Sequence, residues 1–131
     1  MNTKLVLGAS AIFMGSCGIV ALFLPHEMLG TIGIAPVGIL PVLVQLLAAL
    51  LFAFAMVNWM ARGSLIGGIY NRPVAMGNLT HFGIGALTLT KAVISGDRAT
   101  PVVMLACLYA IFAVAFAILL FRSPVRAKDV V

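Results

Sequence analysis

The chain has 131 residues, of which 63% are hydrophobic and only 8% are charged, and its mean hydropathy is +1.22. Soluble domains carry about 25% charged residues, so this composition excludes a water-soluble globule and indicates a protein surrounded largely by lipid. The length fits one domain, and we expect residues 1–131 to form a single transmembrane domain.

Four stretches reach the ~20 mainly apolar residues that a membrane-spanning helix needs: 5–24, 38–61, 74–94 and 102–121. Backbone groups in hydrocarbon must be satisfied within their own segment, which favours helices. Runs such as LLAALLFAFAM do not alternate as barrel strands do. We therefore predict an all-α fold, an integral membrane four-helix bundle.

The first stretch, 5–24, follows Lys4 and could be mistaken for a signal peptide, but its apolar run is long for a signal core. Small residues let membrane helices approach closely, and this segment has four of them at helical spacing: Gly8, Ala11, Gly15 and Gly18. We expect that face to contact another helix.

The connection 25–37 starts and ends near prolines and is still apolar. Proline does not continue a helix, so we expect a short helix at the membrane surface rather than an extension of the first span. His26 and Glu27 are adjacent at its start, and two side chains do not make a metal site. We interpret them as a solvated pair, with a proton- or metal-handling pair as the alternative.

The segment "RGSLIGGIYNRP" connects the second and third spans, and its Gly63, Gly67 and Gly68 predict the end of a helix. Asn71 and Pro73 suit the cap and first turn of the next helix. Trp59 and Tyr70 are typical of a membrane interface. We expect Arg62 and Arg72 to contact lipid headgroups, or alternatively a specific anion at the exposed amides of that helix start.

The third span is the polar one. Gly77, His81 and Gly85 recur every four residues and share a face, with Asn78 beside them. A rise of 1.5 Å per residue places Asn78, Asn58 and Ser10 at nearly one depth. Polar groups at such depth face a bundle interior or a cavity. The candidate ligand-binding residues are Asn58, Arg62, Arg72, Asn78 and His81.

A second polar layer is predicted nearer the other surface, about 8–11 Å deep; its members are Cys17, Gln45, Thr88 and Tyr109. Interhelical hydrogen bonding explains both layers. The alternatives are a lined cavity with His81 as a proton relay or ligand contact, and a haem ligand. Cys17 and Cys107 fall at similar depths. They could form a disulfide, or they could be two separate buried thiols.

Basic residues orient the bundle, because cytoplasmic loops carry more Lys and Arg. Four spans place six of them on the side of the termini: Lys4, Arg62, Arg72, Arg122, Arg126 and Lys128. Lys91 and Arg98 fall on the other side. We therefore expect cytoplasmic N- and C-termini, and the net charge of +5 needs no nucleic-acid partner.

Catalysis is not expected, since the three carboxylates, Glu27, Asp97 and Asp129, lie at the membrane surface or in the tail. No phosphate-binding GxxxxGK[ST] motif is present. We expect no cofactor and no metal, and the expected partners are membrane lipids, further copies of the chain or a larger membrane complex.

The length, the span count, the "LFLP" end of the first span and the Gly/Asn-rich turn after the second resemble the small, four-helix DoxX-like bacterial inner-membrane proteins. The resemblance implies a multi-pass protein of the bacterial inner membrane, and some such proteins resemble accessory subunits of quinone-linked complexes. The expected function is an accessory or assembly-type subunit. The alternative is an oligomeric small-molecule or ion transporter or channel that uses a polar layer around His81.

Overall fold

A computed structural model gives the structure and describes residues 2–63, 71–96 and 99–122. Several residues considered above lie outside this described part: Gly67, Gly68, Tyr70, Asp97, Arg98, Arg126, Lys128 and Asp129. The side chains of Asn71 and Arg122 also lie outside it, so the predicted cap at Asn71 stays a prediction.

The described part of the chain is helical throughout, apart from turns and short connections. The helices are α1 (Thr3–Phe23), α2 (Pro25–Thr31), α3 (Leu40–Ala61), α4 (Asn71–Ile94) and α5 (Thr100–Arg122). The predicted all-α class is confirmed. Three of these helices, α1, α3 and α5, are long and apolar enough to cross a membrane, so the protein is a membrane protein by this criterion.

The break between α1 and α2 lies where the prolines predict it. Leu24 has φ −124° and ψ 48°, which ends α1, and Pro25 occupies the first turn of α2. The new helix is shorter than the predicted 25–37 segment, because Gly33 and Gly38 adopt positive φ values of 75° and 59°. These turns reverse the chain into α3, and the buried side chains of Pro25 and Leu29 anchor α2.

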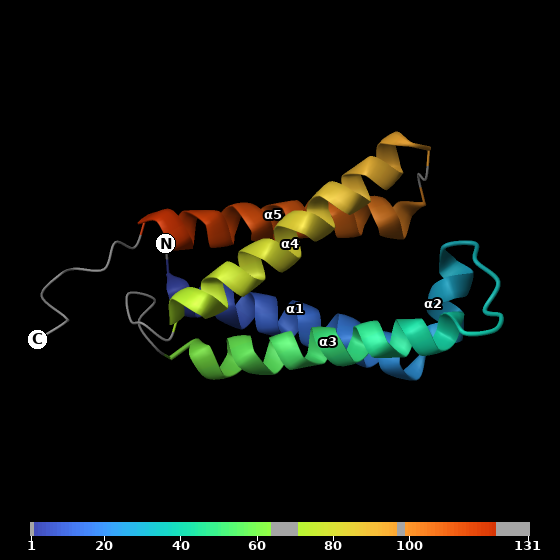
Figure 1. The fold of residues 1–131 in the computed structure, drawn as a ribbon, viewed down its shortest axis with the longest axis horizontal. Coiled ribbons are helices and arrows are strands. Elements are labelled where there is room, and N and C mark those ends of the chain that lie inside the picture. The colour runs from blue at the N-terminus through green and yellow to red at the C-terminus, as the bar shows by residue number, and fades with distance from the viewer. Residues whose placement is uncertain (1, 64–70, 97–98, 123–131) are drawn as a thin grey trace, which may run out of the picture.

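The four long helices form two antiparallel hairpins, as Figure 1 shows. α1 packs along α3, and α4 packs along α5, whereas the two hairpins approach each other at far fewer backbone positions. Within the first hairpin Gly18 lies directly against the α3 backbone. A Cβ at this position would be 3.1 Å from the carbonyl oxygen of Ala48 and 3.2 Å from the nitrogen of Phe52. Of the predicted small-residue face, Gly15 and Gly18 therefore contact α3, whereas nothing lies within 4 Å of the Cβ position of Gly8.

Aromatic rings fill the space between the hairpins. Phe13 of α1 stacks on Phe112 of α5 with a centroid distance of 5.3 Å, and it also approaches Phe82 of α4 at 6.4 Å. Phe82 and Phe116 are fully buried and stack at 5.8 Å. Large rings carry much of the packing energy of such a core, so this cluster joins α1 to the second hairpin.

We predict that Gly18→Leu destabilises the protein while Gly8→Leu does not. A side chain at Gly18 must displace α3 backbone, and overpacking of this kind costs about 1–3 kcal/mol. Gly8 has open space where its Cβ would be. Thermal unfolding of the detergent-solubilised variants checks this, and equal melting temperatures for the two variants would contradict the packing described here.

Candidate functional site

The two hairpins are joined, towards the end where α3 stops and α4 starts, by a pair of asparagine side chains. Asn58 of α3 donates from Nδ2 to Oδ1 of Asn78 at 2.7 Å, and Asn78 of α4 donates from Nδ2 to Oδ1 of Asn58 at 2.6 Å. Each amide therefore both donates to and accepts from the other. We call this the amide pair, and both residues are 0% exposed.

The remaining protons of the amide pair are also satisfied. The Asn58 Nδ2 group contacts Ser10 Oγ at 3.1 Å and Met14 Sδ at 3.8 Å, both on α1. Asn78 donates its other proton to the carbonyl oxygen of Val74, at 2.8 Å. Ser10 in turn donates to the carbonyl oxygen of Leu7. The network links α1, α3 and α4, and every amide proton of the pair has a partner, so neither asparagine has a free donor for a ligand.

This closed network follows from the depth of its members. Every unpaired polar group in hydrocarbon is costly, and two facing amides can satisfy each other with two parallel hydrogen bonds. The predicted common depth of Ser10, Asn58 and Asn78 is the depth at which the structure joins them. Interhelical bonds in membranes contribute about 0.6 kcal/mol on average and up to about 1.7 kcal/mol each.

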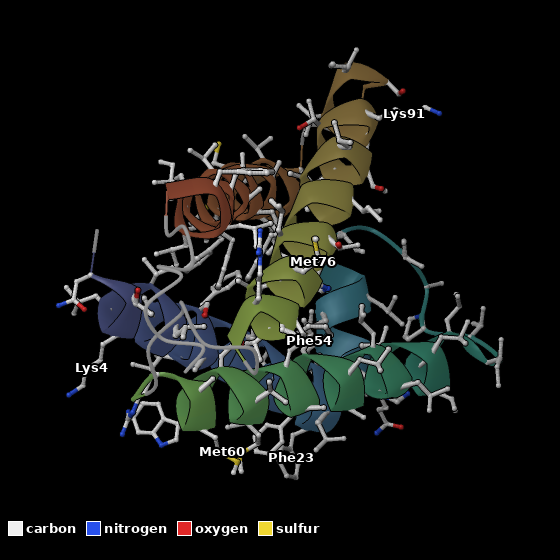
Figure 2. The ribbon with its side chains drawn as sticks, turned by 60° about the vertical axis from the view of Figure 1, so that its left-hand side comes forward. Lys4, Phe23, Phe54, Met60, Met76 and Lys91 are labelled. Atoms are coloured by element: carbon white, nitrogen blue, oxygen red, sulfur yellow. The ribbon has the colours of Figure 1, made fainter. Side chains whose placement is uncertain are left out.

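His81 lies on the same face of α4 as Gly77 and Gly85. It makes a second polar contact, separate from the amide pair. Its Nε2 is 3.2 Å from the hydroxyl oxygen of Tyr109 on α5. Its ring stacks on Phe54 of α3 at 5.2 Å, and Figure 2 shows Phe54 between α3 and α4. His81 is thus held by both hairpins and only half-buried.

Tyr109 lies flat against α4 because residue 85 has no side chain. A Cβ on Gly85 would lie 2.5 Å from both Cδ1 and Cε1 of the Tyr109 ring. The ring also meets Phe82 at 5.1 Å and Phe13 at 6.1 Å. Gly85 therefore fixes the distance between α4 and α5 at this level and brings the Tyr109 hydroxyl to His81.

The four side chains of the predicted second layer, Cys17, Gln45, Thr88 and Tyr109, are not hydrogen-bonded to one another. Gln45 is exposed and donates to the carbonyl oxygen of Leu22 at 3.1 Å. Thr88 is exposed and donates to Ile84 of its own helix at 2.9 Å. Of the four, Cys17 and Tyr109 face a common space.

Tyr109 belongs with His81 because the helices start earlier than predicted. α4 begins at Asn71 and α5 at Thr100. Because each helix starts earlier than predicted, its polar side chain is deeper in the membrane. At 1.5 Å per residue, His81 and Tyr109 each lie about 14–15 Å from the start of their own helix. That depth is near the middle of a ~30 Å hydrocarbon core, where the two predicted layers meet.

A largely apolar chamber opens beyond Tyr109 where the hairpins diverge. Its volume is about 330 Å³, and side chains from all five helices line it. Leu47 and Leu51 of the first hairpin face Leu89 and Leu105 of the second, and Leu29 of α2 closes one end. Such a volume is at the small end of ligand-binding pockets, and few polar groups reach it, among them Cys17 and Tyr109.

The cysteines do not form the disulfide considered above. Cys17 and Cys107 are both free thiols, and Cys107 is exposed on α5 while Cys17 faces the chamber. In the described residues no three His, Cys, Asp or Glu side chains gather into a group that could hold a metal ion.

The five candidate ligand-binding residues therefore do not form one site. Asn58 and Asn78 bond each other, and His81 bonds Tyr109. Arg62 lies over the Trp59 ring, with Cζ 3.2 Å from the ring centroid, while Arg72 is exposed at the start of α4. Sequence reasoning missed the His81–Tyr109 pair because both helices start earlier than predicted, and it missed the chamber because a chamber depends on how the hairpins cross.

Comparison of the chain with protein-family models, with curated proteins and with solved structures found no significant match. The resemblance to DoxX-like proteins therefore stays a prediction, and the assignment of function depends on the geometry described above.

We predict that Asn58→Leu and Asn78→Leu each destabilise the protein by about 1–3 kcal/mol, because each leaves the partner amide buried and unpaired. The double variant should lose less than the sum, since no amide is then left alone. Unfolding in mixed micelles with rising dodecyl sulfate measures all three, and Gln45→Leu, which removes an exposed amide, is the control. Strictly additive losses would contradict the reciprocal pair.

We predict that Gly85→Ala lowers stability by about 1–3 kcal/mol, because the added methyl group overlaps the Tyr109 ring and forces α4 and α5 apart. Gly83→Ala is the matched control two residues away, since open space surrounds its Cβ position. Thermal unfolding distinguishes the two variants. The same loss in both would mean that Tyr109 does not lie against Gly85.

Proposed function

We propose that the protein is a four-span integral membrane protein of the bacterial inner membrane with both termini in the cytoplasm. α4 is less apolar than the other three long helices, but its 24 residues extend about 36 Å, which exceeds a ~30 Å hydrocarbon core. It crosses α5 in Figure 1, and two polar side chains between its charged ends, Asn78 and His81, are bonded to other helices.

The orientation rests on the basic side chains. Lys4, Arg62 and Arg72 lie at one end of the molecule, which we call the Lys4 end, and Lys91 lies towards the other end of α4. Excess Lys and Arg on the cytoplasmic side is the usual rule, and this rule favours a cytoplasmic Lys4 end.

In this topology the protein acts as an accessory or assembly-type component without catalysis of its own. The single observation that carries this proposal is the closure of the polar network between the hairpins. The amide pair has no free N–H donor, and beyond His81 and Tyr109 the space between the hairpins is lined mainly by leucine and other apolar side chains. A conducting pathway needs polar groups or water along its length.

Two further observations support a non-catalytic role. Glu27 is the one carboxylate among the described residues, and it is exposed on α2, away from His81. The exposed residues of α3 are mostly large and apolar, such as Leu46, Leu50 and Met60. Lipid, another copy of the chain or a larger membrane complex can cover such a surface.

A second candidate function is an oligomeric carrier of small molecules, and the chamber of about 330 Å³ is the observation that favours it. Its polar groups, Tyr109 and Cys17, lie where a bound molecule would need a hydrogen bond. Transport would require the hairpins to separate at the amide pair, since His81 and Tyr109 close the chamber on that side.

We predict that vesicles containing the purified protein pass protons no faster than protein-free vesicles, because the described residues of the hairpin interface form no polar route. A pH-sensitive dye inside potassium-loaded vesicles, with valinomycin added, measures the proton flux. His81→Ala and Tyr109→Phe should behave as wild type. Flux above the protein-free level that either substitution abolishes would favour the transporter instead.

The same preparations test the accessory role directly. Native mass spectrometry after gentle detergent extraction should find the chain in a stoichiometric complex with another copy or another membrane protein, and His81→Ala should leave that complex intact. A chain that stays monomeric and carries a small molecule lost in His81→Ala would contradict the accessory role.

A further inference from the structure

The face of the first hairpin that points away from α4 and α5 is hollowed along its length. A pocket of about 430 Å³ at the Lys4 end is lined by Lys4, Gly8 and Arg62, among others. A second hollow of about 340 Å³ continues towards Ile19 and Phe52. Both are lined by Ile12 and Trp59, so the two shallow hollows adjoin, and we call them together the α1–α3 groove.

The two ends of this groove differ in charge. Lys4 and Arg62 lie at its mouth, and the rest of its length is lined mainly by small and apolar side chains. Lys4 is at the start of α1 and Trp59 is near the end of the antiparallel α3, so both lie at the same end of the molecule. Glu27, the one carboxylate in the described residues, is beyond the opposite end of α1. The mouth is therefore cationic and has no carboxylate nearby among these residues.

Arg62 is held in place by the Trp59 ring, since its Cζ lies 3.2 Å from the ring centroid. Stacking of a guanidinium on an aromatic face leaves its N–H donors free along the edge, where they can bind phosphate oxygens in pairs. Lys4 adds a second, more mobile cation across the same pocket. Two cations around one pocket match a phosphate group.

The length of the groove matches a lipid chain. From Lys4 to Ile19 along α1 is fifteen residues, or about 22 Å at 1.5 Å per residue. Half of a ~30 Å hydrocarbon core is about 15 Å, so the groove runs past the depth of one leaflet. Gly8 leaves the groove open near the mouth, because nothing lies within 4 Å of the position of its Cβ.

We propose that the α1–α3 groove is a specific binding site for one anionic phospholipid. The phosphate group lies between Lys4 and Arg62, and an acyl chain follows the groove past Gly8 and Ile12. This site is on the opposite side of the first hairpin from the amide pair and the chamber, and it does not depend on the function proposed above. The charge of the mouth selects an anionic headgroup over a zwitterionic one.

Trp59 gives a direct probe, because it is the only tryptophan in the chain and lines the groove. The protein is reconstituted in phosphatidylcholine vesicles with a rising mole fraction of phosphatidylglycerol brominated on its acyl chains, which quenches nearby tryptophan. We expect quenching to saturate at a low mole fraction, well below that needed with brominated phosphatidylcholine in a phosphatidylglycerol-free vesicle.

Two groove variants test the two parts of the site. K4Q/R62Q should raise the mole fraction of brominated phosphatidylglycerol needed for half-quenching by about 25-fold. Each cation removed accounts for about 5-fold. Gly8→Leu should block the acyl chain and weaken quenching while both cations remain. Each fluorescence signal is normalised to that of the same variant in vesicles of unbrominated lipid. This is needed because Arg62 stacks on Trp59, and its removal changes the tryptophan fluorescence itself.

Matched controls make the result specific. Arg72→Gln removes an exposed cation at the same end that does not line the groove, and Gly83→Leu places the same side chain in open space on α4. Both should quench as wild type. The single variant R62Q is compared with R72Q. If both raise the mole fraction for half-quenching equally, the lipid responds only to diffuse surface charge, and the proposal is overturned.

Three other outcomes would also overturn it. Equal quenching by the two brominated lipids would mean that only bulk lipid fills the groove. Relief of quenching by inorganic phosphate would assign the pocket to a free anion. Quenching that is weak with both lipids and rises when the protein is diluted in the membrane would place a second copy of the chain in the groove.

Discussion

The structure depends on the mutual satisfaction of two side-chain amides buried between the hairpins. Asn58 and Asn78 come from different hairpins, and each provides both the donor and the acceptor that the other needs. The two hairpins approach each other at few backbone positions, so apolar packing alone leaves their relative depth weakly defined. The amide pair specifies that depth, because sliding one hairpin past the other by one helical turn would leave both amides unpaired in an apolar core.

Several other features follow from this alignment. With the amide pair in place, His81 of the second hairpin reaches Phe54 of the first, while Gly85 and Tyr109 set the distance between α4 and α5 within the second hairpin. The hairpins then diverge on the side of α2, which leaves the apolar chamber. The polar groups at the centre thus hold the structure together, and the surfaces that remain for interaction are the chamber and the outer face of the first hairpin, where Lys4, Trp59 and Arg62 meet. This division is what an assembling or lipid-binding protein requires, and it differs from a pathway lined by polar groups.

The sequence predicts the helices well because their apolar runs and prolines are local signals. Pro25 separates α1 from α2 as expected, and the common depth of Ser10, Asn58 and Asn78 follows from counting residues along helices. The site was harder to predict. A shift of two or three residues in a helix start moved His81 and Tyr109 to the same level, and one-dimensional depth cannot show that Gln45 and Thr88 point outwards. The chamber and the α1–α3 groove depend on crossing angles between helices, which hydropathy does not encode.

The most direct test of this account is solid-state NMR of the protein in lipid bilayers with labelled asparagine, of which the chain has four. The account predicts that the side-chain amide protons of Asn58 and Asn78 exchange slowly with water and show cross-peaks to each other, while Asn2, which is exposed, exchanges rapidly. Rapid exchange at Asn58 and Asn78, without a contact between them, would place water at the centre of the bundle. That result would contradict the closed amide pair and the accessory function argued from it.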